Sequence, residues 1–320
     1  MNNYNRYLEW RYFQIFKFSN FQIKKILKTC LLLVMMAGCQ QKKSALVFQS
    51  DFGVKDGAVS AMKGVAFGVD GSIPMYDITH EIPAYNVWEA AYRLYQSAPY
   101  WPEGTVFVSV VDPGVGTERK SIVMKSKTGH FFATPDNGTL TLVAEHLGIE
   151  SVREIDESIN RRSGSNNSYT FHGRDVYAYT GARLASATIS FEDIGNELPD
   201  EVVKIDYQHA GIVSDTIKGN IPVLDVQYGN IWTNINDSLL NRLQIKAGDR
   251  IAVTIFNDSN VIFHDSMPFV HTFGEVAFAK PLGYMNSLMN FSLAINQRNF
   301  ADSFKIGSGP GWKVSLRKLN

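Results

Sequence analysis

The chain has few cysteines, no excess of charge of either sign and no long apolar run, and each absence excludes a class of protein. Of its 320 residues only Cys30 and Cys39 are cysteines, so residues 40–320 can form neither an internal disulfide nor a thiolate metal site. Lysine plus arginine and aspartate plus glutamate number 31 each, and no basic stripe lies beyond the extreme N-terminus. This balance argues against nucleic-acid binding. A content of 45% apolar residues suits a globular protein held together by its core.

The N-terminal segment has the pattern of a bacterial lipoprotein signal. Its apolar run, LLLVMMAG, has about half the ~20 residues that a spanning helix needs. Three lysines precede the run, and Cys39 follows Ala-Gly. We expect residues 1–39 to be a lipoprotein-type signal segment, residues 40–44 a spacer, and lipidated Cys39 a membrane anchor facing the periplasm. An ordinary signal peptide or a buried helix is the alternative.

Apolar runs alternate with amphipathic stretches over residues 45–200, the expected N-terminal domain. A strand covered on both faces shows little alternation, as in residues 105–111. The pattern predicts strands at 45–48, 73–79, 105–111, 121–126, 130–134 and 152–155, helices at 56–70 and 86–97 with Asn86 as an N-cap, and a loop at 164–168. This alternation predicts an α/β domain with a mainly parallel sheet.

The sequence pattern changes beyond about residue 200, where short β-rich runs are separated by Asn, Asp, Gly and Pro. No long helical period occurs in this part. The expected strands are VVKIDY, IPVLDV, DRIAVTIF, VIFHDS, FSLAIN and WKVSLR. Residues 201–320 are therefore predicted to form a second, antiparallel β domain.

We expect an acid at the end of each of the first three strands: Asp51, Asp77 and Asp112. Ligands bind outside the carboxyl ends of the strands in open α/β sheets, so these acids are candidates for one site. After Asp112 the chain reads PGVGTER, and its prolines and glycines favour a tight bend that returns Arg119 toward the acid. An adjacent guanidinium would keep the carboxylate ionised. The alternative is a helix cap or a structural ion pair.

A further candidate is His172 in TFHGRD at 170–175. A histidine here serves as a general base or as a hydrogen-bond donor to a developing charge, or it is a satisfied loop residue. Metal-dependent hydrolysis through His80, Asp112 and His172 is another interpretation, although their spacing fits no standard zinc motif.

Seven segments, taken in one order, resemble the S-adenosyl-L-methionine (SAM) hydroxide adenosyltransferase family, also called SAM hydrolases, which is related to SAM-dependent fluorinases and chlorinases. Singly each segment is a weak signal, but together they are specific. They are SDFGVKDG, DITHEI, VDPGVGTER, PDNG, TFHGRD, DVQYGNIWTN and NSLMNFSLAIN.

The resemblance implies a C-terminal domain that is β-barrel-like, and a homotrimer. SAM would bind between the N-terminal domain of one subunit and the C-terminal domain of its neighbour. Asp112, Arg119 and His172 would act on a water that attacks the 5′ carbon of SAM, giving adenosine and L-methionine. This scheme requires no metal or redox cofactor. We expect the protein to contact the membrane only through the lipid anchor.

The resemblance also implies eight binding residues. Each has a structural alternative as a cap, a turn residue or a core residue. They are Asp51 for the ribose hydroxyls, Asp56 and Ser287 for the amino-acid part of SAM, Asp225 and Asn230 for the methionine, Ile295 and Gln297 for backbone contacts to adenine, and Phe273 for stacking on adenine.

Two rival functions stay open on the sequence. The halogenase branch carries Tyr at the position of Asp112 and Ser at that of Gly173, and an ionised Asp112 would repel a halide, so the resemblance favours hydrolysis. A nucleoside- or SAM-binding lipoprotein without turnover is the second rival, against which the intact set of Asp112, Arg119 and His172 argues.

Overall fold

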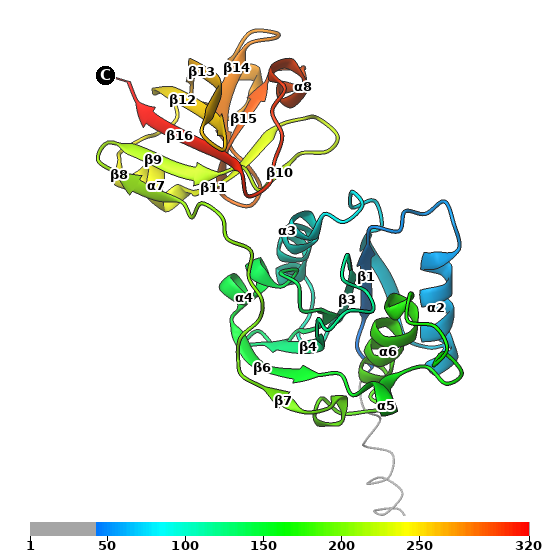
Figure 1. The fold of residues 1–320 in the computed structure, drawn as a ribbon. Coiled ribbons are helices and arrows are strands. Elements are labelled where there is room, and N and C mark those ends of the chain that lie inside the picture. The colour runs from blue at the N-terminus through cyan, green and yellow to red at the C-terminus, as the bar shows by residue number, and fades with distance from the viewer. Residues whose placement is uncertain (1–42, 320) are drawn as a thin grey trace, which may run out of the picture. The chain divides into compact units, whose positions relative to one another are not determined.

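The computed structural model describes residues 43–319, and the expected signal segment with Cys39 lies outside them. A seven-stranded sheet and its helices come first (Figure 1). Their elements are β1 (Leu46–Ser50), α2 (Ala58–Val69), β2 (Met75–Thr79), α3 (Val87–Ser97), η1 (Ala98–Tyr100), β3 (Val106–Val110), β4 (Ser121–Ser126), β5 (Phe131–Pro135), α4 (Thr141–Leu147), β6 (Ile149–Glu154), α5 (Glu157–Asn160), η2 (Gly173–Ala178), α6 (Tyr179–Ala185), η3 (Glu192–Ile194) and β7 (Glu197–Leu198).

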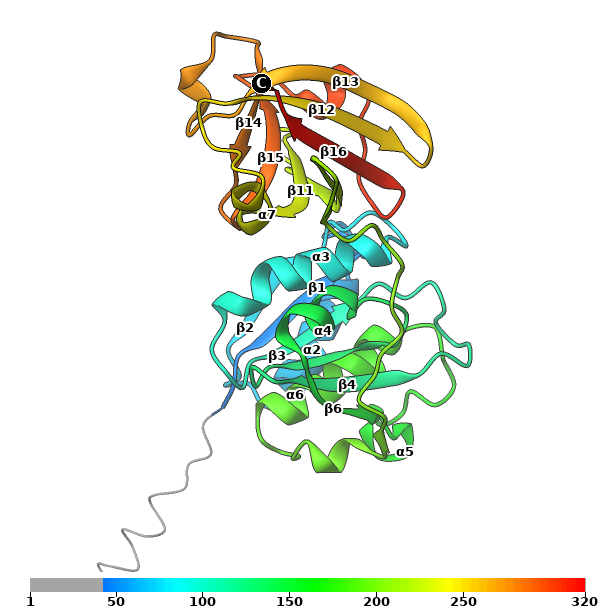
Figure 2. The ribbon, with the colours of Figure 1, turned by 90° about the vertical axis from the view of Figure 1, so that its left-hand side faces the viewer.

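The first sheet has the order β2-β1-β3-β5-β4-β6-β7. Its strands β2, β1, β3 and β5 are parallel, whereas β4 pairs antiparallel with both β5 and β6. The turn between β4 and β5 is too short for a crossover, which explains this antiparallel edge. Helices cover both faces, with α2 and α6 on one and α3 and α4 on the other (Figures 1 and 2).

Strand β1 shows why the sequence forms this layered core. Leu46 and Phe48 pack with α2 and α6, and Val47 packs on the opposite face with residues of α3. All five residues of β1 are buried. A continuous apolar run is expected for a parallel strand covered on both faces.

Most predicted elements of the first domain are confirmed, including the helix capped by Asn86. Its side-chain oxygen accepts a hydrogen bond from the backbone N–H of Glu89 at 3.0 Å. Helices α4 and α6, both of seven residues, were not predicted from the sequence, because such short helices give little periodic signal.

The second part of the chain consists of two antiparallel sheets, which confirms the predicted fold class. Their orders are β10-β11-β15-β14 and β13-β12-β16-β9-β8. The elements are β8 (Gly211–Val213), β9 (Thr216–Asn220), β10 (Val223–Leu224), β11 (Ile231–Asn236), α7 (Asp237–Arg242), β12 (Arg250–Asn257), β13 (Asn260–Pro268), η4 (Phe273–Glu275), β14 (Pro281–Met285), β15 (Asn290–Ile295), α8 (Phe300–Phe304) and β16 (Trp312–Lys318).

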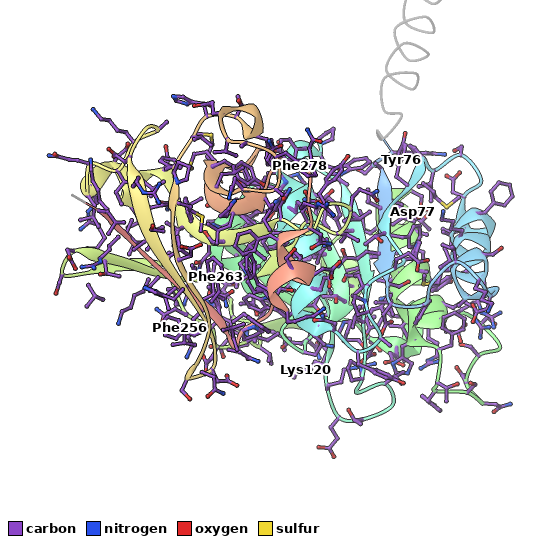
Figure 3. The ribbon with its side chains drawn as sticks, turned by 90° about the horizontal axis from the view of Figure 1, so that it is seen from above. Tyr76, Asp77, Lys120, Phe256, Phe263 and Phe278 are labelled. Carbon is purple, nitrogen blue, oxygen red and sulfur yellow. The ribbon has the colours of Figure 1, made fainter. Side chains whose placement is uncertain are left out.

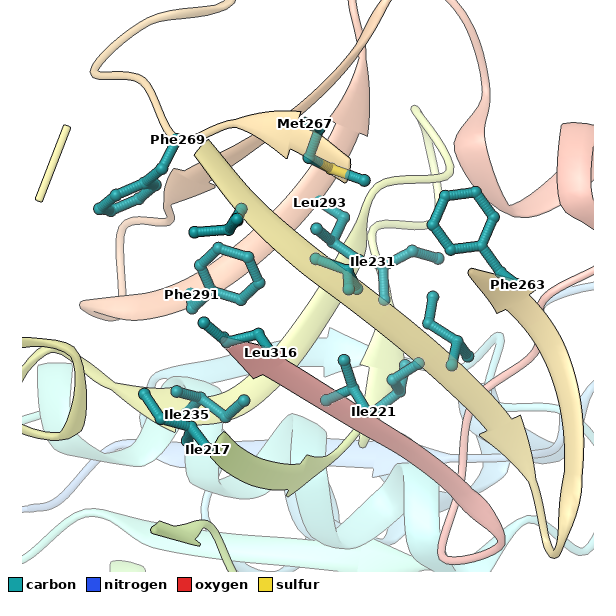
Figure 4. Packing of buried hydrophobic residues seen from close by; sticks show 14 of the residues in the cluster. Ile217, Ile221, Ile231, Ile235, Phe263, Met267, Phe269, Phe291, Leu293 and Leu316 are labelled. Atoms are coloured by element: carbon teal, nitrogen blue, oxygen red, sulfur yellow. The ribbon is translucent and has the colours of Figure 1, made fainter. Parts of the chain in front are cut away.

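The two antiparallel sheets enclose one apolar core. Ile217 and Leu316 come from one sheet, and Ile231, Phe291 and Leu293 come from the other (Figure 4). All five side chains are buried. Burial alternates along β11, as expected for an antiparallel strand with one covered face, whereas every residue of β15 after Asn290 is buried.

Two predicted strands of the second part are wrong or shorter than expected. VVKIDY forms no strand, because its backbone N–H groups bond to side chains of the first domain: Val203 donates to Asp136 and Ile205 to Thr141. In IPVLDV only Val223–Leu224 is a strand. Among the described residues, no helix is long and apolar enough to cross a membrane.

Candidate active site

The bend after β3 returns the chain onto Asp112, as its sequence predicts. The backbone N–H of Val115 donates to the carbonyl of Asp112, and Thr117 bonds back to the carbonyl of Gly114. Gly116 has φ +77°, a conformation that a residue with a side chain rarely adopts. The two successive turns place Arg119 beside the acid that ends β3.

Arg119 forms a bidentate ion pair with Asp112. Its Nε lies 3.0 and 3.1 Å from the two carboxylate oxygens, and Nη2 also donates to Oδ2. The side chains of Arg119 and Asp112 are only 11% and 6% exposed. Burial opposes the charged guanidinium, but the hydrogen bonds to Asp112, together with the attraction of Asp112 and Glu157, outweigh it and raise the pKa of Arg119. The guanidinium is therefore charged at neutral pH.

Two buried hydroxyls fix the other edge of the guanidinium. Nη1 of Arg119 donates to Ser121 Oγ at 3.0 Å, and Ser121 Oγ lies 3.0 Å from Tyr177 Oη. Tyr177 is fully buried, and burial raises its pKa, so its hydroxyl stays protonated. The sequence analysis missed both residues, since neither belongs to a motif with its own chemistry.

His172 completes this cluster from the loop before a π-helical turn, Gly173–Ala178. Its Nδ1 lies 2.8 Å from Nη2 of Arg119, and the residue is buried. Burial lowers the pKa of His172, and the nearby guanidinium groups of Arg119 and Arg161 lower it further against the opposing effect of Glu157. The imidazole is therefore neutral at physiological pH.

This lowered pKa predicts how His172 affects stability. On unfolding, the ring regains an ordinary pKa of about 6.5. The unfolded chain then binds more protons at this position, so the stabilisation is present above that pH and is lost as the pH falls below about 6.5 toward the folded-state pKa. We expect the stability advantage of wild type over His172→Gln, measured by urea unfolding, to shrink on acidification. An advantage that grows instead would contradict this assignment.

A cavity of about 270 Å³ adjoins the cluster at the carboxyl ends of β1 and β3. Asp112 and His172 line it together with Asp51 and Tyr85. Asp51 is held by the backbone N–H of Tyr85, which donates to Oδ2 at 2.8 Å. The cavity therefore brings Asp51, the residue predicted to hold the ribose, to the same place as two of the three predicted catalytic groups.

A second cavity, of about 700 Å³, lies in the C-terminal part of the chain. Four predicted binding residues line it: Asn230, Phe273, Ile295 and Gln297. Asp225 joins them indirectly, because its Oδ2 accepts a hydrogen bond from Nδ2 of Asn230 at 3.2 Å. The two cavities share no lining residue.

Comparison with known proteins settles the family. A model described as the SAM hydroxide adenosyltransferase N-terminal domain matches residues 46–195, and one described as the C-terminal domain matches residues 219–313. The chain belongs to the SAM hydroxide adenosyltransferase family. It is thereby one of a family of enzymes that process SAM.

Relatives of this family member are named either (R)-S-adenosyl-L-methionine hydrolase or fluorinase. An (R)-S-adenosyl-L-methionine hydrolase of Salinispora tropica is 32% identical over 272 residues, covering 84% of this chain and 96% of its own. A protein of the same name from Methanocaldococcus jannaschii is 38% identical over 207 residues, covering 63% of this chain and 74% of its own. A fluorinase of Nocardia brasiliensis is 27% identical over 304 residues, covering 86% and 98%.

Solved structures share the fold of this SAM hydroxide adenosyltransferase family member. An uncharacterised conserved protein of Thermotoga maritima superposes with a TM-score of 0.77 at 30% identity, covering 85% of this chain and 99% of that one. A conserved hypothetical protein of Thermus thermophilus gives a TM-score of 0.64 at 26% identity, covering 86% and 100%.

Besides Asp225, two predicted binding residues line neither cavity. Asp56 lies at the start of α2, where its Oδ1 accepts from the N–H of Ala58 at 2.9 Å. Ser287 lies in the turn between β14 and β15. The structure gives Asp56 a local structural contact, and the substrate contacts of both residues stay predictions.

The expectation that Asp77 ends its strand and joins the site is wrong. Asp77 lies within β2, beside Tyr76 (Figure 3). Its carboxylate bonds to Lys63 and lies 3.1 Å from Nε2 of His80, whose Nδ1 lies 2.7 Å from Ser50 Oγ. These contacts lower the pKa of Asp77 against the opposing effect of burial. Asp77 does not line the cavity that Asp51 and Asp112 share.

His80 and His172 thus contact different partners, and the structure does not join them with Asp112 as metal ligands. Within the described part of the chain, no group of three or more His, Cys, Asp or Glu side chains could hold a metal ion.

Gly173 gives this site a different wall from the one that a serine would provide. A Cβ at this position would lie 3.0 Å from Val110 Cγ1 and 3.3 Å from the ring of Phe52. Phe52 in turn packs edge-on against Phe171. A Ser side chain at this position, as in the halogenase pattern, would therefore require Val110 and Phe52 to shift by a few tenths of an ångström.

Proposed function

We propose that the protein hydrolyses SAM to adenosine and L-methionine by attack of water on the 5′ carbon. The observation that carries this proposal is the buried cluster of Asp112, Arg119 and His172 beside a cavity that Asp51 also lines. Relatives named (R)-S-adenosyl-L-methionine hydrolase support the reaction class.

The leaving group decides what the site must supply. When the 5′ carbon–sulfur bond breaks, the sulfonium becomes a neutral thioether, so the leaving methionine needs no proton. The task is to hold a water in line with the departing sulfur and to take its proton. Positioning of this kind contributes up to ~7–11 kcal/mol in favourable cases. Asp112 can accept the proton, while Arg119 and His172 stabilise the developing charge.

Halide transfer is the rival reaction, because some relatives are named fluorinases. A carboxylate at the position of Asp112 places a negative charge where a halide would have to sit, and like charges repel. Gly173 offers no hydroxyl to such an ion. Both features favour water as the nucleophile.

The direct experiment is a product assay on protein lacking residues 1–39. SAM is supplied with and without added chloride or fluoride, and adenosine, methionine and 5′-halogenated adenosine are quantified. We expect equal amounts of adenosine and methionine at every halide concentration. A halogenated product would support the rival reaction, and SAM binding without any product would support a non-catalytic binder.

We further propose that the complete site forms between subunits of a homotrimer. Asp51, Asp112 and His172 line one cavity, and the other is lined by Asn230, Phe273, Ile295 and Gln297, with no shared residue. SAM would then bridge the N-terminal cavity of one subunit and the C-terminal cavity of its neighbour. The membrane anchor at Cys39 remains a proposal based on the sequence pattern of residues 1–39 alone.

Mixed trimers test this arrangement. Asp112→Asn disables the first cavity, and Asn230→Ala with Phe273→Ala disables the second. When chains of both kinds assemble at random, about a quarter of the interfaces combine two intact cavities, because each half-site is intact with probability one half. We expect co-refolded mixtures to recover about a quarter of wild-type activity, while each variant refolded alone stays inactive. Mixtures no more active than the separate variants would contradict shared sites.

A further inference from the structure

Both ring nitrogens of His172 lie against guanidinium groups. Nδ1 lies 2.8 Å from Nη2 of Arg119, and Nε2 lies 2.9 Å from Nη2 of Arg161. The first guanidinium belongs to the proposed catalytic cluster. The second has no place in that cluster, and no motif in the sequence marks it.

Arg161 is held as firmly as Arg119. Its Nε and Nη2 donate to Oε2 of Glu157 at 3.0 and 2.7 Å, and its guanidinium lies 4.7 Å from the ring centre of Tyr169. The side chain is only 4% exposed. Asp112, Arg119, His172, Arg161 and Glu157 therefore form one continuous chain of contacts, with a carboxylate at each end and the imidazole in the middle.

Hydrogen-bond chemistry does not allow both contacts of the imidazole to be equivalent. An arginine can only donate, whereas a neutral imidazole has one nitrogen that donates and one that accepts. Only one guanidinium can therefore donate to His172, and the other must face the ring N–H. When a ligand or water enters the cavity, that ring N–H can donate a hydrogen bond to it.

The residues near Nδ1 of His172 differ from those near Nε2. Asp112 lines the cavity beside His172, whereas Arg161 and Glu157 do not. Arg119 has other acceptors, since it bonds to both oxygens of Asp112 and to Ser121. Besides the imidazole of His172, the hydrogen-bond acceptors of Arg161 among the described residues are Glu157 and, at a long 3.4 Å, the carbonyl of Ser168.

We propose that Arg161, oriented by Glu157, is a positioning residue that makes Nε2 of His172 the acceptor and leaves the ring proton on Nδ1, toward Asp112 and Arg119. This proposal rests on the proposed function, and it assigns opposite roles to His172 and Asp112, the two groups that would face the attacking water. His172 donates a hydrogen bond to the water oxygen and to the hydroxyl that forms from it. Asp112 is then the acceptor of the water's proton.

The tautomer can be read without any turnover. In protein labelled with ¹⁵N-histidine, the nitrogen of His172 that carries the proton is identified by NMR, and the signals are assigned by their loss in His172→Gln. We expect the proton on Nδ1 in wild type and in Arg161→Lys, and on Nε2 in Arg161→Met. A wild-type ring protonated on Nε2, or an unchanged pattern in Arg161→Met, would overturn the proposal.

Kinetics with SAM give the second readout. Arg161→Met is expected to lower kcat by roughly tenfold, less than the 10²–10⁴ expected for losing an acid–base group itself, with little change in KM. Arg161→Lys should restore most of the loss. The matched control is Arg93→Met, which breaks a second (i, i+4) Glu–Arg pair within residues 43–319, Glu89–Arg93 on α3, and should leave kcat and the ring pattern unchanged. A kcat unaltered by Arg161→Met would refute the positioning role.

The two readouts separate the two proposals. If the NMR pattern is as expected but no variant or wild type turns over SAM, the positioning of His172 stands and the proposed function fails. If SAM is hydrolysed but the proton lies on Nε2, the function stands and the role of Arg161 fails.

Discussion

Asp112→Asn is expected to reduce turnover of SAM by roughly 10²–10⁴ while SAM still binds. An asparagine side chain has nearly the shape of aspartate, and its Oδ1 can still accept a hydrogen bond from Arg119. What it loses is the negative charge and the ability to take a proton from water. The loss should therefore appear in kcat and leave the dissociation constant for SAM within a few-fold of wild type.

Single-turnover kinetics and calorimetric titration with SAM measure the two quantities separately. The matched control is Asp215→Asn, which removes an exposed carboxylate that lies 3.9 Å from Arg317 and accepts a hydrogen bond from Thr216 Oγ1 at 3.0 Å. Turnover by Asp112→Asn at near wild-type rate would remove Asp112 from the mechanism.

The second large effect is expected on stability, from Arg119→Met. This substitution leaves the buried carboxylate of Asp112, 6% exposed, without its cation. Breaking a buried ion pair on one side costs about 3–5 kcal/mol, because an uncompensated charge stays buried. The free energy of unfolding in urea should fall by that amount, and activity should be lost as well.

A double-mutant cycle identifies the cause of this destabilisation. Asp112→Asn combined with Arg119→Met removes the stranded charge, so the double variant should be more stable than Arg119→Met alone. For comparison, Lys125→Met breaks the half-exposed pair with Glu150, and exposed pairs contribute about 0–1 kcal/mol. A loss in Arg119→Met no larger than that of Lys125→Met would contradict a buried pair.

Strands were predictable from the sequence where burial on both faces leaves a continuous apolar run, as in β1 and β3. VVKIDY was predicted as a strand because it is a short β-rich run, but its N–H groups bond to Asp136 and Thr141. No local pattern reveals partners that lie more than 60 residues away in the sequence. Tertiary contacts therefore overrode strand propensity in that segment.

The candidate site likewise contains residues that the local sequence predicts and residues that it does not. The pairing of Asp112 with Arg119 follows from the glycine-rich bend between them, so the sequence predicts it. His172 was placed beside them only through the family resemblance, because 53 residues separate it from Arg119. Arg161 escaped notice altogether, since its role depends on the close approach of α5 to the ring of His172.

The most direct test of the account is the source of the oxygen in the product. SAM is incubated with the protein in water enriched in ¹⁸O, and the adenosine is analysed by mass spectrometry. Attack of water on the 5′ carbon predicts one ¹⁸O atom at the 5′ position of adenosine, in proportion to the enrichment. Adenosine without the label, or a product bearing a halogen in place of that oxygen, would contradict it.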